Sequence, residues 1–423
     1  MALSSSGKQT IAVIGSGMAG LAAAYGCRQN GHEVTVFEAE DGHGMDAHSM
    51  TVDGGIVDVP LRVMSPDFWP AMLSLADSVG VETFRVSTRT SCSWLDGTTW
   101  FRSGRLPVLD WPSVGSVRYL NGRALRLTRG LFQLSRLTRK MQDADNGLTL
   151  RDALKQHRLD PLFWRGLMLP VLTTICTCDE DHLLAWPAAQ LLPMLGGILN
   201  QADLYRLKGG TSALVEQLAK DLTLKAGSPV TEVREMDGGV RVHNARGDGG
   251  LFDRAILATQ ANALEYLDAT RFAEERRVLS DIHFASGELW VHRDKRFMPA
   301  SRTDWTALNF QMDRALEKPM FTVWVNAVEP TMAHQAPVFQ TWNPLYEPKA
   351  DKVLARVPLQ RAVVHAGTAQ VHDKLQQWHR QPDRKVFFCG SWAYEGVPLL
   401  ESAVRSAQVV VDLIGKAGKA MPA

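Results

Sequence analysis

Cysteine is scarce in this sequence, with five residues in a chain of 423. Their number is odd and their spacing is irregular, which argues against a disulfide framework. Cys176 and Cys178 form the one close pair, but no second Cys/His pair lies at a spacing that would complete a zinc site. We therefore expect reduced thiols and no metal centre.

Long hydrophobic runs and an excess of one charge are also missing. No apolar run is long enough to span a bilayer, and the first ten residues, MALSSSGKQT, lack the hydrophobic region of a signal peptide. The formal net charge of +1 argues against a nucleic-acid partner bound by bulk charge. We expect an intracellular protein, cytoplasmic or peripherally membrane-associated. The sequence does not predict an oligomeric state.

Several catalytic signatures are absent as well: a Ser-His-Asp elbow, a zinc signature and a P-loop. What remains is an ordinary globular composition, 45% hydrophobic and 22% charged, in a chain whose length suits two packed domains.

The first segment with clear chemistry lies near the N-terminus. Residues 11–14 read IAVI, which predicts a buried parallel strand, and GSGMAG follows at once. A helical pattern then runs to Gly31, and VTVF at 34–37 predicts a second strand that ends at Glu38. A glycine motif alone is a weak signal, but strand, motif, helix, second strand and acid in this order predict a dinucleotide-binding βαβ unit.

Each glycine of this motif, and the acid after it, has a physical role. Gly15 allows the tight turn, Gly17 lets the backbone approach a pyrophosphate, and Gly20 lets the helix pack on the strand. Glu38 accepts hydrogen bonds from ribose hydroxyls and would repel the 2′-phosphate of NADP. NAD and FAD both remain open on the motif alone. The predicted cofactor-binding residues here are Gly15, Ser16, Gly17, Met18, Ala19, Gly20, Glu38 and Ala39.

Later segments carry a resemblance that separates the two cofactors. They are KGGTSALVEQLAK at 208–220, FDRAILATQ at 252–260, HRDKRFMP at 292–299, FQTWNPL at 339–345 and FFCGSWAYEGVPLLESAVRSA at 387–407. With the N-terminal unit, they make the sequence resemble the FAD-dependent amine oxidase superfamily, which includes phytoene desaturases. Within it, the chain looks closest to the predicted NAD/FAD-binding amine oxidase-like proteins.

The resemblance implies an α/β fold with bound FAD. A discontinuous Rossmann-type FAD-binding domain would comprise residues 1–70, 205–265 and 360–423, and an α+β substrate domain residues 71–204 and 266–359. It also implies that the backbone of Val230 meets the adenine side, that Gly390 and Ser391 reach the flavin, and that the helix opening near Glu401 points its N-terminus at the cofactor. Helix N–H groups would stabilise negative charge on a reduced flavin.

The sequence departs from the family pattern at three places. Met45 and Asp46 stand where two glycines are expected, and the usual Asp-x-Gly reads Asp58-Val59-Pro60. Pro60 fixes φ and removes an N–H, so local backbone contacts to the cofactor are expected to differ. No residue matches the catalytic lysine of the family, which places ordinary amine oxidation in question.

Candidate catalytic residues are drawn from the matched segments. His292 lies in an alternating strand pattern and would face the substrate cavity or form a cross-strand contact. Arg62 would offer a charge to the flavin or to an anionic substrate, or form a structural ion pair. Trp392 and Tyr394 would wall the flavin pocket or simply pack. Three further residues lie outside the primary set: Trp342 and Asn343 would wall the flavin pocket or simply pack, and His48 would lie near the cofactor or in a surface loop.

One stretch is unusually basic. From Trp111 to Gln142 there is no Asp or Glu, but six arginines and one lysine are interleaved with Leu and Phe. We interpret it as a solvated helix face over the substrate domain, with peripheral contact to an anionic membrane as the alternative.

The prediction for the whole chain is an FAD-dependent oxidoreductase that takes a hydride from a largely apolar small molecule or lipid. The alternatives are a redox-neutral lipid isomerase or hydratase that uses bound FAD, an amine oxidase, and a binding protein with a structural flavin. The resemblance names neither the substrate nor the electron acceptor.

Overall fold

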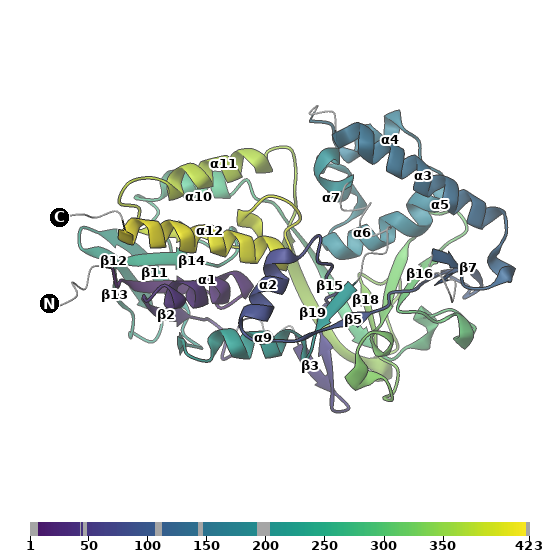
Figure 1. Cartoon of the computed structure of the whole chain (residues 1–423), viewed down its shortest axis with the longest axis horizontal. Coiled ribbons are helices and arrows are strands. Elements are labelled where there is room, and N and C mark those ends of the chain that lie inside the picture. The colour runs from purple at the N-terminus through teal and green to yellow at the C-terminus, as the bar shows by residue number, and fades with distance from the viewer. Residues whose placement is uncertain are drawn as a thin grey trace.

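The computed structural model describes residues 7–42, 44, 49–105, 112–142, 147–192 and 204–419. Two halves lie side by side along the long axis of the molecule, one built on a parallel sheet and one on a larger mixed sheet (Figure 1). All five cysteines are free and buried. No helix in the described ranges is both long enough and apolar enough to cross a bilayer.

The first half is organised by a five-stranded sheet in the order β10-β2-β1-β14-β20, with every neighbouring pair parallel. The central strand β1 is buried from Ile11 to Ile14 because both faces of the sheet are covered, as is usual for parallel sheets. The strands are β1 (Thr10–Ile14), β2 (Glu33–Phe37), β10 (Thr223–Lys225), β14 (Arg254–Leu257) and β20 (Val386–Phe388).

Helices cover one face of this sheet, where α12 packs closely on α1: a Cβ added at Gly26 would lie 3.0 Å from the Val411 side chain. The opposite face carries a three-stranded antiparallel sheet and two helices. The first group is α1 (Met18–Gln29), α2 (Pro70–Ser78), α9 (Gly210–Ala219) and α12 (Leu400–Lys419); the second is β11 (Val230–Met236), β12 (Gly239–Asn244), β13 (Gly250–Phe252), α10 (Ala273–Leu279) and α11 (Thr368–His379).

The second half is built on an eight-stranded sheet in the order β19-β15-β18-β17-β16-β6-β7-β8. Only the β16–β6 pair is parallel among the pairs of this sheet that the structure describes. The strands are β6 (Thr90–Trp94), β7 (Thr99–Arg105), β8 (Pro112–Val114), β15 (Phe284–His292), β16 (Leu308–Met312), β17 (Met320–Trp324), β18 (Phe339–Trp342) and β19 (Val353–Ala362).

A group of helices packs on this sheet and forms the second large core, which includes Cys92, Phe163, Trp186 and Phe321. In Figure 1 these helices lie together above the sheet. They are α3 (Gly122–Gln142), α4 (Leu150–Gln156), α5 (Pro161–Phe163), α6 (Leu169–Cys176) and α7 (Glu180–Leu184).

Two short antiparallel pairs lie between the halves: β3 (Ser49–Val52) with β4 (Gly55–Asp58), and β5 (Thr83–Val86) with β9 (Leu204–Leu207). The α/β class and the N-terminal βαβ unit that the sequence predicts are confirmed. All five strands of the parallel sheet fall inside the three stretches assigned to the FAD-binding domain. The domain boundaries themselves stay a prediction, and α10, placed there in the substrate domain, packs against the parallel sheet.

Candidate functional site

The turn between β1 and α1 forms an open cradle. Gly15 has φ +99°, and a Cβ at Gly20 would lie 1.9 Å from the Gly15 carbonyl oxygen, so the helix starts in direct contact with the strand end. A Cβ at Gly17 would meet no atom within 4 Å, so space lies outside the turn at this residue. Among the described residues, no acceptor is found for the backbone N–H groups of Met18, Ala19 and Gly20. Unpaired N–H groups at a helix start are the groups that bind a pyrophosphate.

Glu38 lies at the end of β2 and contacts the same turn. Its Oε2 accepts the Ser16 N–H at 2.8 Å and the Ser16 hydroxyl at 2.7 Å, and its Oε1 accepts the Glu40 N–H at 3.0 Å. A carboxylate offers about four lone-pair sites, so room for a ribose hydroxyl remains. The site is narrow, because Glu38 is buried and a Cβ at Gly44 would lie 2.9 Å from Oε2.

The residues after Glu38 extend this end of the site. Ala39 follows the acid directly and is exposed. The Ser228 N–H donates to the Glu38 carbonyl oxygen at 2.7 Å, and this bond places Val230, at the start of β11, on the Glu38 side of the sheet. Val230 packs against the apolar cluster there and does not line the large cavity described below.

The C-terminal segment forms the other end of the candidate cofactor site. The Gly390 N–H donates to the Ser406 hydroxyl at 3.0 Å, which fixes the turn after β20 against α12. The first backbone hydrogen bond of α12 is donated by the Ala403 N–H to the Leu399 carbonyl oxygen. For the N–H groups of residues 400–402, no acceptor is found among the described residues. These amides open toward the same space as Ser391.

The Glu401 side chain contacts the start of α2. Its carboxylate accepts the N–H groups of Ala71 at 3.1 Å and Met72 at 2.9 Å, and it pairs with Arg405 at 2.6 Å. The side chain therefore caps α2 and joins it to α12. Its backbone, together with the start of α12, still faces the cavity.

One cavity of about 1420 Å³ joins these parts. Gly17–Ala19, Pro60–Val63, Gly390–Trp392 and Leu399–Ala403 line it at the parallel-sheet half. From there it extends between the halves to apolar side chains of the helices and the mixed sheet, which include Leu127, Leu131, Val171, Ile175, Phe310 and Phe321. The unpaired amides and the open glycine at one end fit the pyrophosphate and flavin of FAD, and Glu38 fits its ribose.

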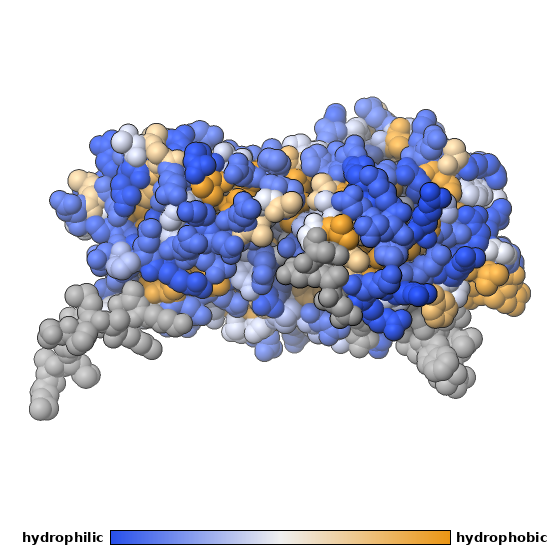
Figure 2. Space-filling model, turned by 90° about the horizontal axis from the view of Figure 1, so that it is seen from above, coloured by the Kyte–Doolittle hydropathy of each residue, from blue (hydrophilic) through white to orange (hydrophobic). Residues whose placement is uncertain are grey.

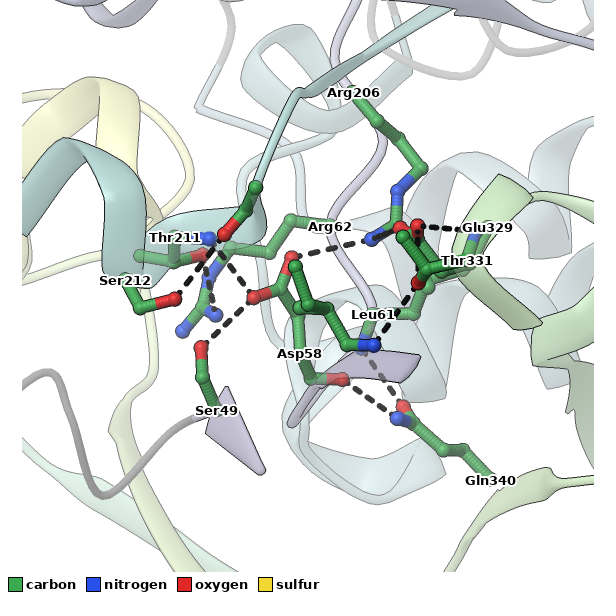
Figure 3. A network of polar contacts seen from close by, with 12 residues as sticks. Ser49, Asp58, Leu61, Arg62, Arg206, Thr211, Ser212, Glu329, Thr331 and Gln340 are labelled. Carbon is green, nitrogen blue, oxygen red and sulfur yellow. Dashed lines mark hydrogen bonds and ion pairs between the residues drawn. The ribbon is translucent and has the colours of Figure 1, made fainter. Parts of the chain in front are cut away.

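A buried ionic network holds the Pro60 loop at the cavity edge (Figure 3). Asp58 Oδ1 accepts the Thr211 N–H at 2.9 Å and the Ser49 hydroxyl at 2.8 Å. Asp58 Oδ2 lies 3.2 Å from Arg206, which also lies 2.9 Å from the Glu329 carboxylate. All three charged side chains are almost fully buried. Asp58 therefore has a structural position directly before the cis peptide Val59-Pro60.

The loop after Pro60 is fixed from a second side by Gln340. Its Nε2 donates to the Asp58 carbonyl oxygen at 2.6 Å, and its Oε1 accepts the Leu61 N–H at 2.7 Å. Arg62 then donates to Thr211 Oγ1 at 3.1 Å and lines the cavity. Burial and the neighbouring Arg206 lower the pKa of Arg62 while Asp58 opposes them, and the guanidinium stays charged.

A second cavity arginine was missed by the sequence reasoning. Arg361, near the end of β19, lines the cavity and donates to the Ile175 carbonyl oxygen at 2.8 Å. Burial, helped by the charge of Arg62, lowers its pKa to about 10. The alternating pattern of β19 was the available signal, because it places Leu359 and Arg361 on one side of the strand.

The aromatic and histidine candidates divide into two groups. Trp392 and Tyr394 line the cavity, and the Trp392 indole donates to the Thr259 carbonyl oxygen at 3.0 Å. His292 does not line it: the side chain is fully buried, contacts Phe297 and Phe339, and its Nε2 lies 3.0 Å from Thr341 Oγ1. The expectation that His292 faces the substrate cavity is therefore corrected.

Trp342 and Asn343 are also absent from the cavity wall. Trp342 packs in a separate core beneath Gly287, and the Asn343 side chain accepts the Glu288 N–H at 2.8 Å. His48, Met45 and Asp46 lie outside the described residues. Within the described ranges, no group of three His, Cys, Asp or Glu side chains is placed to hold a metal ion.

Comparison with known proteins shows the family of the chain. The model of the flavin containing amine oxidoreductases matches residues 18–356. AofH of Mycobacterium tuberculosis, which its name assigns provisionally to the flavin-containing monoamine oxidases, is 27% identical over 286 residues, 60% of this chain and 58% of its own. Putrescine oxidase of Kocuria rosea is 25% identical over 265 residues, 60% of this chain and 52% of its own. The chain thus spans about half the length of the curated relatives it matches.

Solved structures share the fold over nearly the whole chain. A putrescine oxidase variant superposes with a TM-score of 0.68 at 15% identity, covering 97% of this chain and 99% of its own. A fatty acid isomerase from P. acnes that produces CLA reaches 0.64 at 17% identity, covering 97% and 99%. At such identities the likeness shows the fold alone. The family model, however, covers most of the chain, and the protein therefore belongs to the flavin containing amine oxidoreductases, whose cofactor is FAD.

Proposed function

We propose that this protein is an FAD-dependent oxidoreductase that takes a hydride from a largely apolar small molecule or lipid. The observation that carries the proposal is the single cavity of about 1420 Å³, which runs from the dinucleotide cradle to an apolar wall in the other half. Ligand sites of flavoenzymes need a dry, shaped space beside the cofactor, and the part of this cavity between the halves is lined by apolar side chains.

The charges in the cavity support a neutral or anionic substrate over a protonated amine. Its charged lining residues in the described part of the chain are five arginines and two glutamates, with no lysine: Arg62, Arg85, Arg89, Arg361, Arg405, Glu395 and Glu401. Glu401 is already engaged by α2 and Arg405. A cationic substrate beside Arg62 and Arg361 would be repelled by both guanidinium groups, which costs binding energy.

The protein would contribute position and electrostatics. When bound, FAD supplies the hydride acceptor. The N–H groups of residues 400–402 at the start of α12 would stabilise negative charge at the flavin end, and Trp392 and Tyr394 would wall the reacting region. Arg361, deeper between the halves, would hold an acidic group of the substrate.

Anaerobic mixing with chosen substrates tests the proposal. Flavin absorbance of the holoprotein should bleach with a long-chain unsaturated fatty acid or a polyene and not with putrescine or a monoamine. Conversion of the lipid without lasting bleaching, but only in the flavin-loaded protein, would replace hydride removal by isomerisation, the reaction type named for one structural neighbour. Bleaching by amines alone would overturn the proposal.

A pair of variants gives the control. Thr174 lines the cavity, and Thr174→Trp should slow bleaching by a long substrate at least about tenfold while FAD content stays normal, because the bulky ring fills apolar space. Thr51→Trp, on the exposed β3 strand, should bleach at the normal rate.

A further inference from the structure

Large apolar side chains are exposed in one region around the start of α3. Val117 is 81% exposed, Leu120 67%, Leu125 71% and Phe132 73%. The other exposed large hydrophobic residues of the described chain are scattered and less exposed: Met236, Leu251, Leu345 and Val409. Figure 2 shows hydrophobic side chains gathered at the end of the molecule where α3 begins. Clusters of this kind mark interaction sites on otherwise polar surfaces.

The helix α3 has two distinct sides. Leu127, Leu134, Leu137 and Met141 are buried at helical spacing on the side that packs on the protein. The opposite side carries an exposed stripe of residues at positions i, i+4, i+7, i+11 and i+15. These intervals place all five residues on one face of the helix. The stripe is Leu125, Arg129, Phe132, Arg136 and Lys140. Together with Val117, Leu120 and Arg139 we call it the α3 surface.

The charge of the α3 surface is uniformly positive. No Asp or Glu occurs between Trp111 and Gln142. Arg118 and Arg126 are paired with Asp304 and Asp160. The other cations of this stretch, however, make no ion pair with a described residue; they are Arg123, which lies over the Trp94 ring, and Arg129, Arg136, Arg139 and Lys140. A helix face that contacts only water gains no stability from exposed Phe132 and Leu125 side chains between these cations.

We propose that the α3 surface docks on an anionic lipid bilayer, with Val117, Leu120, Leu125 and Phe132 at headgroup depth and the cations on the phosphates. Apolar side chains alternating with Arg and Lys on one helix face fit the membrane–water boundary, and several such cations attract anionic lipids together. A second copy of the chain is a poor occupant, since it would place two sets of unpaired cations against each other.

The side of α3 that faces the protein gives a functional reason for membrane docking. Ala124, Leu127 and Leu131 of α3 line the large cavity. Docking would therefore bring a cavity wall to the bilayer surface. The docking inference itself rests on exposure and charge, and it stands whether or not the substrate is a lipid.

Vesicle co-sedimentation of the FAD-loaded protein tests the inference. Binding is expected to vesicles of phosphatidylcholine mixed with phosphatidylglycerol at low salt, weaker binding at high salt, and little to phosphatidylcholine alone. Arg129→Glu with Arg136→Glu should weaken binding to the mixed vesicles about tenfold or more. Phe132→Ser should weaken it severalfold and leave the salt dependence in place.

Matched controls come from the scattered residues. Leu251→Ser and Met236→Ser, both exposed apolar positions on the antiparallel sheet of the FAD half, should bind vesicles like the parent protein. All variants are at exposed positions, so FAD content and circular dichroism should not change. Equal, negligible sedimentation with both vesicle types would overturn the inference. So would a dimer in analytical ultracentrifugation that Phe132→Ser dissociates.

Discussion

Glu38 holds the dinucleotide turn together before it contacts any ligand. Three hydrogen bonds from Ser16 and Glu40 reach its carboxylate inside a buried site. The acid is thus already oriented, so a ribose hydroxyl would bind to a fixed acceptor at little entropic cost.

We expect Glu38→Ala to weaken FAD binding by about 1.5–3 kcal/mol, the range for a hydrogen bond to a charged group. Titration of the apoprotein with FAD, followed by flavin fluorescence, measures the change. Ser16→Ala removes one donor and keeps the carboxylate, so its effect should be clearly smaller. Unchanged affinity in Glu38→Ala would falsify the ribose assignment.

Single residues were the hardest part to predict from the sequence. The pattern around His292 correctly indicates a strand, but the last four residues of β15 are all buried, so alternation does not tell which side holds a cavity. The Asp58–Arg206–Glu329 network joins residues far apart in the chain, and no local pattern connects them. Trp392 and Tyr394 could be placed because they follow directly after a strand end at the site.

The β1–α1 unit shows the opposite case at the scale of elements. All its determinants are local: a β-branched strand, a glycine turn and a helix with small residues facing the strand. The predicted strands therefore agree with β1 and β2 within one residue, whereas α1 begins at Met18, inside the glycine motif and before the predicted start at Leu21. For α3, helical spacing and charge were visible in the sequence, whereas the exposure of Phe132 and Val117 depends on packing by distant elements.

Two glycine variants separate cofactor binding from folding in this unit. Gly17 has φ −63° and open space around an added Cβ, so Gly17→Ala should fold normally. It should nevertheless lose FAD affinity by about tenfold or more, because the methyl group occupies space that the pyrophosphate approaches.

Gly20→Ala is the contrasting variant. Its Cβ would lie 1.9 Å from the Gly15 carbonyl oxygen, so the helix and strand must separate. A large fall in melting temperature is expected together with FAD loss. Normal FAD affinity in Gly17→Ala, measured by the same fluorescence titration, would show that the cofactor does not approach this turn.

At the scale of the whole molecule, two buried histidines couple stability to pH. Burial lowers the pKa of His292 to about 4 and that of His379 to about 3. His379 Nε2 accepts the Phe388 N–H at 3.0 Å and so anchors β20 from α11. In both cases the neutral ring is the form that the folded protein holds.

Stability should therefore fall as the pH drops below the unfolded-state value of about 6.5, since only the unfolded chain then binds protons readily. Each buried histidine contributes about 1.4 kcal/mol per pH unit until its folded pKa is reached. Urea denaturation of the FAD-loaded protein at pH 7 and pH 5 measures the loss. The glutamine of His379→Gln still accepts the Phe388 N–H but does not bind a proton in this pH range. The variant should therefore lose less stability than the parent protein between pH 7 and pH 5. Equal pH dependence in both proteins would contradict this account.

The strand order of the parallel sheet also imposes a condition on synthesis. β1 pairs with β14, β14 pairs with β20, and α12 covers α1, so the first strand and the last helix that the structure describes belong to one core. While the chain is still on the ribosome, β1, α1 and β2 are present before β14 and α12, and apolar surface of β1 and α1 stays open. Long-range pairing of this kind folds slowly and exposes aggregation-prone surface meanwhile. We therefore expect the nascent protein to gain from chaperone protection until α12 emerges, and its yield in cells to depend on chaperone supply as well as on final stability.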